Sequence, residues 1–175
     1  MKEVLSTRSI ELHKEYLREQ RLKLSIFEKS YPGIVGLPNS RLGALRLPRR
    51  EKEQIVALRN RVNAHELFFS SFLETKYNES EIVKRQLGDI SYLLNRVYKL
   101  CMDSYGGIVY IVVKGKGVFL EHKTEDEEPS NLPVLAIDNC EHTYFLDYGF
   151  NKEEFLSRLL PYLALSKIDE FYKIG

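Results

Sequence analysis

Two long stretches of helical periodicity in the first half of the chain constrain its fold most strongly. In residues 49–74, apolar side chains and one histidine recur every three or four positions, so they share one face of a helix. This stripe consists of Ile55, Leu58, Val62, His65, Phe69 and Phe72. Residues 6–30 carry a similar stripe, and Ser6 suits the N-cap position of that helix. Its members are Ile10, His13, Leu17 and Leu24.

The segment between these helices, residues 31–48, predicts a connecting loop. Its first eight positions, YPGIVGLP, hold four prolines and glycines. Pro48 is expected at the start of the second helix, where its missing N–H is not needed. A basic run nearby favours a solvated helix entry over a polyanion site, and it comprises Arg41, Arg46, Arg49, Arg50 and Lys52. We therefore expect an antiparallel helical hairpin.

One histidine lies on the apolar face of each predicted helix, His13 on the first and His65 on the second. Burying an imidazole costs free energy unless both ring nitrogens find partners. A metal on one nitrogen and a hydrogen bond on the other would satisfy the ring. The alternative is a core histidine bonded to a backbone carbonyl.

The second half of the chain predicts mixed structure. A helix over residues 79–103 precedes a glycine break, and β-branched runs at 108–113 and 118–122 flank the turn Lys114–Gly117. An acidic surface loop, 124–131, leads to a third strand, 132–137. Asn151 caps a helix that Pro161 should bend, and 167–172 forms a last helix. The predicted fold class is α+β, with the helical hairpin followed by a mixed lobe holding a three-stranded antiparallel sheet and flanking helices.

The third predicted strand ends at a carboxylate, Asp138, with His142 four residues further on. Ligands at a strand end are held by the sheet on one side and by loop packing on the other, which suits a metal that needs fixed donors. The alternative is an aspartate that caps the next turn beside a histidine satisfied by other groups.

Residues 138–148, DNCEHTYFLDY, resemble the signature of the iron/manganese superoxide dismutase family, Asp-x-Trp-Glu-His-Ala-Tyr-Tyr-Leu-x-Tyr. Residues 64–69 are similar to the family's second ligand motif, Asn-His-x-x-Phe-Trp, and residues 6–13 resemble the start of its first long helix. Cys140 stands where the family has tryptophan, and the chain contains no tryptophan.

The resemblance implies one iron or manganese ion per chain, held by His13, His65, Asp138 and His142 with solvent as a fifth ligand. It implies two domains: a helical-hairpin domain, residues 1–78, that supplies two histidine ligands, and an α/β domain, residues 79–175, that supplies the aspartate and the third histidine. The implied activity is superoxide dismutation, which converts superoxide to dioxygen and hydrogen peroxide.

Three further positions take catalytic roles from the resemblance. His122 falls where the family places a glutamine or histidine that helps set the redox potential and proton delivery; the alternative is an exposed histidine at a strand end. Arg21 falls near the family's gating tyrosine, where it would attract anionic superoxide or block its entry. Glu141 is similar to the glutamate that reaches His142 of the partner subunit, which implies a homodimer.

Several departures from the family pattern leave the reaction open. Leu17 replaces a histidine near the metal, Phe145 replaces a tyrosine, and Arg61 occupies the position of a glutamine in iron-type members. The chain is therefore either a divergent dismutase, or a metalloprotein of the same fold with other oxidative chemistry involving Cys140, or a structural or interaction protein. The last would be expected to have lost ligands, and all four are present.

Composition bears on the partners and the cellular location of the protein. Lysine plus arginine, 26 residues, nearly balance aspartate plus glutamate, 25 residues, so charge does not favour a nucleic-acid or membrane partner. Two cysteines form no disulfide framework, which fits a reducing compartment. The N-terminus carries no apolar core of a signal peptide, and no apolar run is long enough to span a bilayer. A cytoplasmic location is expected.

Overall fold

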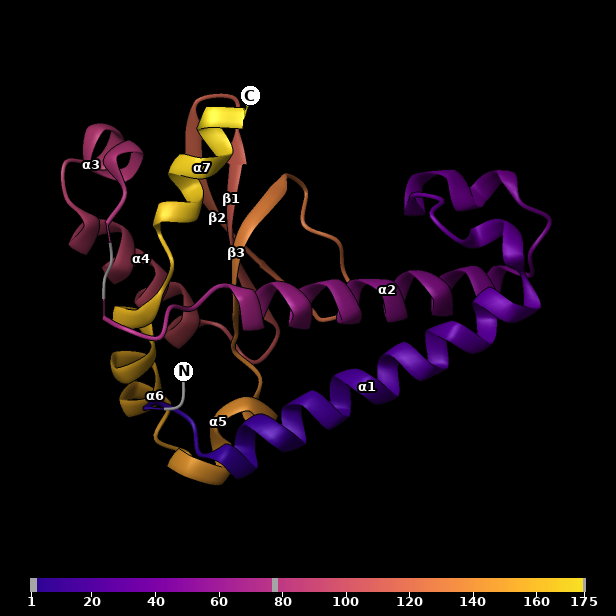
Figure 1. Cartoon of the computed structure of the whole chain (residues 1–175), viewed down its shortest axis with the longest axis horizontal. Coiled ribbons are helices and arrows are strands. Elements are labelled where there is room, and N and C mark those ends of the chain that lie inside the picture. The colour runs from indigo at the N-terminus through magenta and orange to yellow at the C-terminus, as the bar shows by residue number, and fades with distance from the viewer. Residues whose placement is uncertain (1–2, 77–78, 175) are drawn as a thin grey trace.

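The computed structural model of the chain describes residues 3–76 and 79–174. Two long helices, α1 (Thr7–Ser30) and α2 (Arg49–Ser70), form a hairpin that extends away from the rest of the molecule (Figure 1). The connecting segment carries the short helices η1 (Pro32–Ile34) and η2 (Asn39–Ala44). The predicted antiparallel hairpin is confirmed.

A small apolar cluster around Ile34, Leu42 and Ile55 closes the far end of the hairpin. Arg59 on α2 donates to the carbonyl oxygens of Leu37, at 2.6 Å, and of Ile34, at 2.5 Å. Because one guanidinium bonds two carbonyl groups of the connecting segment, this segment is held against α2.

The remainder of the chain is a three-stranded antiparallel sheet surrounded by helices. The strands are β1 (Ile108–Lys114), β2 (Gly117–Lys123) and β3 (Leu132–Asp138), in the order β2-β1-β3. The helices are α3 (Glu81–Leu87), α4 (Ile90–Asp103), α5 (Glu141–Tyr148), α6 (Lys152–Leu159), η3 (Leu160–Tyr162) and α7 (Ser166–Ile174). The predicted α+β class and the sheet are confirmed.

The central strand β1 is buried along almost its whole length. The hydrophobic core around this strand continues onto one side of the helical hairpin. Ala64 and Phe68 of α2 belong to the same apolar cluster as Ile111 of β1 and Leu135 of β3. In the described residues, no helix is both long and apolar enough to cross a membrane. The predicted domain boundary at residue 78 lies outside the described residues.

The prediction of one helix over residues 79–103 is wrong, because two helices, α3 and α4, stand there. Gly88, with φ of 79°, ends α3, and Asp89 caps α4 by accepting a hydrogen bond from the Ser91 N–H at 2.9 Å. A left-handed glycine followed by a capping aspartate stops one helix and starts the next.

Two further boundaries differ from expectation. Helix α2 ends at Ser70, not near residue 74, because the next residues bond elsewhere: the Leu73 N–H donates to the Tyr162 carbonyl, and the Ala164 N–H to the Ser71 carbonyl. The segment after Asp138, expected as a loop, is the helix α5. Pro161 ends α6 in a 3-10 turn, as the expected bend required.

Candidate metal centre

His13 reaches the centre from the second turn of α1. The Ser6 hydroxyl caps this helix by accepting from the Ser9 N–H at 3.1 Å, and the Ser6 N–H donates to Asp147 of α5 at 2.8 Å. The start of α1 is thereby fixed beside α5, as Figure 1 shows. The imidazole of His13 is buried and stacks on the ring of Phe68, with 5.2 Å between centroids.

His65 reaches the centre from the middle of α2 and is fully buried. Its Nδ1 atom lies 2.7 Å from the carbonyl oxygen of Arg61, one turn earlier in the helix. Because a carbonyl can only accept, Nδ1 carries the proton and Nε2 is left with a free lone pair. This is the arrangement that a metal-binding imidazole requires.

Asp138 and His142 come from the junction of β3 with α5. Asp138 ends the strand opposite Ile108, and its Oδ1 atom accepts from the Cys140 N–H at 3.0 Å. That bond turns the chain into α5, whose first turn carries His142. Asp138 is completely buried, whereas the side chain of His142 is 38% exposed.

The four side chains converge on one point. Asp138 Oδ2 lies 3.1 Å from His13 Nε2, 3.3 Å from His65 Nε2 and 3.2 Å from His142 Nε2. One ligand atom from each of the four residues can be chosen so that all lie within 4.8 Å of one another. The structure therefore brings together the four residues that the sequence predicted as ligands.

Distance alone would permit hydrogen bonds inside this cluster, but direction does not. Within the described part of the chain, His13 Nε2, His65 Nε2 and Asp138 Oδ2 are buried and have no hydrogen-bond partner. Buried polar atoms are rarely left unpaired, since each costs about 1–3 kcal/mol. These nitrogen and oxygen atoms face a common point and do not face one another. A metal ion bound at that point would satisfy all of them.

Burial and the shared carboxylate act in opposite directions on the titration of the cluster. Burial lowers the pKa of His13. Burial also opposes protonation of His65 and His142, but the charge of Asp138 outweighs it and raises the pKa of both. Burial would raise the pKa of Asp138, but the three imidazoles hold it well below its usual value. Asp138 is therefore an ionised donor.

A comparison of the sequence with protein families decides the assignment. The model of iron/manganese superoxide dismutases, C-terminal domain, matches residues 75–170, which is more than half of the chain. The chain belongs to the iron/manganese superoxide dismutase family. A search for similar curated proteins finds no match.

The donor set fits the metals of the iron/manganese superoxide dismutase family. Three imidazoles and one carboxylate suit a borderline first-row ion, and the orphaned buried atoms described above supply the donors. Asp138 and His142 lie inside the matched residues 75–170. His13 and His65 lie outside them and reach the same point through the helical hairpin.

Glu125 is a residue of this dismutase-family centre that the sequence analysis missed. Its Oε1 atom lies 3.6 Å from His142 Nε2 and 3.7 Å from His65 Nε2, and its side chain is only 19% exposed. The Tyr16 hydroxyl donates to its other oxygen at 3.1 Å. Residues 124–131 were expected to form a surface loop, and a glutamate in an acidic loop gives no signal that it turns inward.

The three residues predicted to be catalytic lie on three different elements, β2, α1 and α5. The Nε2 atom of His122 lies 2.8 Å from the Gly106 carbonyl oxygen, and the residue is exposed. Arg21 is exposed and pairs with Glu66 at 2.5 Å. Among the described residues, neither His122 nor Arg21 belongs to the group of possible metal donors formed by the four predicted ligands. Glu141 is exposed in the first turn of α5, next to His142. These catalytic roles stay predictions.

Cys140, which replaces the family's tryptophan, lies beside the centre. Its Sγ atom accepts from the Gly107 N–H at 3.2 Å, and it shares a second group of possible metal donors with Glu125 and His142. Burial, followed by the charges of Asp138 and Glu125, raises the pKa of its thiol. Cys140 is therefore a neutral thiol, not a reactive thiolate.

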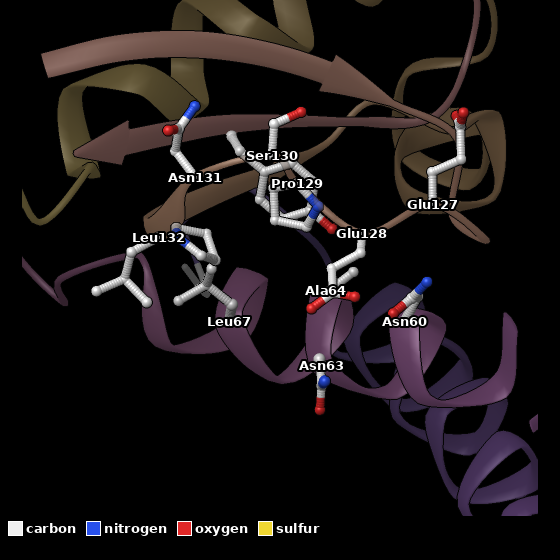
Figure 2. Close-up of a pocket in the computed structure, with 12 residues that line it drawn as sticks. Asn60, Asn63, Ala64, Leu67, Glu127, Glu128, Pro129, Ser130, Asn131 and Leu132 are labelled. Carbon is white, nitrogen blue, oxygen red and sulfur yellow. The ribbon is translucent and has the colours of Figure 1, made fainter. Parts of the chain in front are cut away.

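A depression of about 270 Å³ leads from the surface to this side of the centre. Arg61, Tyr105 and His122 are among the residues that line it, together with Glu125 and Cys140. Another pocket, of about 440 Å³, lies between α2 and residues 127–133. Figure 2 shows its lining, with Asn60, Ala64 and Leu67 on the helix side. None of the four predicted ligand residues lines that pocket or the smaller depression. We place the approach to the centre at the smaller depression because Glu125 and Cys140, which line it, form a group of possible metal donors with His142.

Proposed function

We propose that the chain is a superoxide dismutase with one iron or manganese ion per chain. The observation that supports this most directly is the convergence of His13, His65, Asp138 and His142 in a member of the iron/manganese superoxide dismutase family. The Nε2 atoms of the histidines and Oδ2 of Asp138 would hold the ion. A bound ion of either metal would supply one-electron redox chemistry, since the ion can accept an electron from one superoxide and give it to a second.

The protein contributes fixed donor positions and exclusion of water. His65 is locked by its bond to the Arg61 carbonyl, and Asp138 by its bond from the Cys140 N–H. His13 is sealed by the rings of Phe68 and Phe69. Because these groups are held in place before any ion binds, little free energy is spent on reorganisation at the site.

The depression over Glu125 and Cys140 would admit the substrate. Arg61 contributes a positive charge to its wall, although Asp126 pairs with that guanidinium at 2.5 Å. Superoxide is a small anion, and a cation at the mouth of a narrow opening favours its entry. His122 lies on the same wall, with its Nε2 proton donated to the Gly106 carbonyl.

The deciding experiment measures metal content and superoxide dismutation on the same preparations, expressed with iron or with manganese supplied. We expect about one ion per chain, as one such site predicts, and dismutation that His65→Ala abolishes. Asn63→Ala is the matched control, because Asn63 is an exposed residue of α2 two positions before His65. Metal without dismutation would favour other oxidative chemistry near Cys140, and absence of metal would leave only the fold.

We also propose a homodimer formed through the face that carries α5. Large apolar side chains are exposed there, with Phe150 85% and Tyr105 92% exposed, and Phe145 and Leu146 lie on the same helix as Glu141. A hollow of about 430 Å³ on this face is lined by Tyr105, Glu141, His142 and Phe150, among others. Exposed apolar patches of this kind mark interaction sites.

Sedimentation velocity on the metal-loaded protein tests the dimer. We expect a dimer for the natural chain and a monomer for Phe150→Asp, which places a charge on the proposed interface. Val35→Asp is the matched control, because Val35 is also exposed but follows η1 in the segment that connects α1 with α2. A monomeric natural chain would contradict the proposal.

A further inference from the structure

The inward oxygen of Glu125 is an unsatisfied group at the metal centre. Its Oε1 atom is buried and has no hydrogen-bond partner among the described residues. The closest imidazole nitrogens, His142 Nε2 at 3.6 Å and His65 Nε2 at 3.7 Å, are too far away for hydrogen bonds. We propose that Glu125 is a fifth protein ligand of the ion, a role that rests on the metal site of the proposed function.

The distances agree with ligation of a shared ion. Two donors that each lie about 2.0–2.2 Å from one ion are separated by about 3–4 Å unless they stand on opposite sides of it. The separations of Glu125 Oε1 from His142 Nε2 and His65 Nε2 fall in this range, as do those of Asp138 Oδ2 from the three imidazoles. Glu125 does not belong to the group of four residues whose donor atoms all lie within 4.8 Å of one another, so its side chain would move toward the ion on ligation.

Tyr16 fixes the orientation of this carboxylate. Its hydroxyl donates to Glu125 Oε2 at 3.1 Å, which leaves Oε1 as the oxygen that faces the centre. The Tyr16 ring lies 5.2 Å from the ring of His65 and 5.2 Å from that of His142. A tyrosine that packs on two ligands and holds a third acts as a positioning residue.

The loop that carries Glu125 is tied to α2. The Arg61 guanidinium bonds both carboxylate oxygens of Asp126, at 2.5 and 3.1 Å, and the Asn60 amide donates to the Asp126 carbonyl at 2.7 Å. Glu127 closes the loop by accepting from both the N–H and the hydroxyl of Thr124. These bonds hold Glu125 over the centre before an ion binds.

Charge also favours the assignment. With three neutral imidazoles, the carboxylates of Asp138 and Glu125 balance the charge of a divalent ion and leave a trivalent ion with one net positive charge. Two carboxylates that face the same small space repel each other unless a cation lies between them. Ligation by Glu125 thus explains why a second, largely buried carboxylate is tolerated beside the imidazoles that contact Asp138.

The test uses Mn²⁺ as the probe and compares Glu125→Ala with the natural chain. We expect the variant to bind Mn²⁺ about 10–100-fold more weakly in competition with a chelator, by analogy with the loss of supporting groups at metal sites. We also expect stronger relaxation of bulk water protons per bound Mn²⁺, because water would take the vacated position. Glu128→Gln is the matched control, since Glu128 is an exposed carboxylate of the same loop.

A second variant distinguishes loss of the Glu125 carboxylate from a general disturbance of the loop that carries it. Tyr16→Phe keeps the ring on His65 and His142 but removes the hydroxyl that orients Glu125, so we expect a smaller loss of affinity in the same direction. Unchanged affinity and unchanged water relaxation in Glu125→Ala would overturn the proposal and leave the metal site intact. A natural chain that binds no Mn²⁺ would overturn both. A natural chain that binds Mn²⁺ as predicted but lacks dismutation would contradict the proposed function alone.

Discussion

Asp138 Oδ2 lies 3.1 Å from His13 Nε2, and neither atom has a hydrogen-bond partner in the described part of the chain. The pair is thus close, buried and unsatisfied. Such a contact between a strand end and a helix that are far apart in sequence is expected where both side chains bind one cation.

Metal should stabilise the fold through Asp138. A ligand present at 100 times its dissociation constant raises the free energy of unfolding by about 2.7 kcal/mol. We expect this gain from Mn²⁺ in the natural chain and none in Asp138→Asn, whose amide lacks the anionic oxygen. Urea denaturation with and without Mn²⁺ measures it. Asp103→Asn, a change at an exposed carboxylate, should keep the full gain; a gain retained in Asp138→Asn would contradict the assignment.

Gly107 occupies a position that requires glycine. Its φ is 71°, and a Cβ atom there would lie 2.8 Å from His122 Nε2 and clash with the Lys123 carbonyl. We expect Gly107→Ala to lower the free energy of unfolding by at least about 1–3 kcal/mol, the cost of a strained left-handed residue. Gly43→Ala, where a Cβ meets nothing within 4 Å, should change it by less than about 0.5 kcal/mol. Equal effects in urea denaturation would refute the argument.

The ligand helices could be predicted because their periodicity reports which face is buried. His13 and His65 fall on stripes of apolar residues, and both are buried in the structure. The sheet was predictable for a similar reason, since β-branched runs and a glycine turn define β1 and β2. Each of these signals lies within one segment of the chain.

The features that sequence reasoning missed depend on contacts between segments. Glu125 turns inward because Tyr16, 109 residues earlier, bonds its carboxylate. Helix α5 has only eight residues and begins where the Asp138 carboxylate accepts from the Cys140 N–H, so apolar periodicity does not reveal it. The dipeptide Gly88-Asp89 is a sequence signal for the end of one helix and the start of another. It was missed because the apolar positions on both sides of it fit one continuous helix.

Asp169 should make stability depend on pH. This carboxylate of α7 accepts from the Ser80 hydroxyl at 2.7 Å and from the N–H groups of Glu81 and Ile82, both at 2.9 Å, at the start of α3. Burial opposes the charge of Asp169, but these bonds outweigh it and lower the pKa. Because the folded pKa lies below the unfolded value of about 3.9, the contribution is complete above that value and is lost as pH falls through the folded pKa.

We therefore expect Asp169→Asn to destabilise the protein by about 1–3 kcal/mol at neutral pH, with the difference from the natural chain shrinking below about pH 4. Urea denaturation at a series of pH values measures this difference. Glu170→Gln, at the exposed neighbouring position, should show no such trend. A difference that stays constant down to about pH 3 would show that the charge of Asp169 is not responsible.

Ser71 links the helix of His65 to the strand of Asp138, and its neighbour Ser70 offers a control. Both hydroxyls donate to the Leu67 carbonyl, at 2.7 and 2.9 Å, but only Ser71 Oγ also accepts from the Ala136 N–H, at 2.8 Å. Because β3 is an edge strand and Ala136 is fully buried, Ser71→Ala leaves that N–H without a partner or water. We expect a loss of about 1–3 kcal/mol, against less than about 0.5 kcal/mol for Ser70→Ala.

Hydrogen exchange at the Ala136 amide separates this local effect from a general loss of stability. The amide should exchange faster in Ser71→Ala than global unfolding alone allows, because the bond that protects it is gone. The strand that positions Asp138 would then be held less firmly against α2, so we expect weaker Mn²⁺ binding in the same variant. Normal exchange at Ala136 together with normal Mn²⁺ binding would show that β3 is held in register by β1 alone.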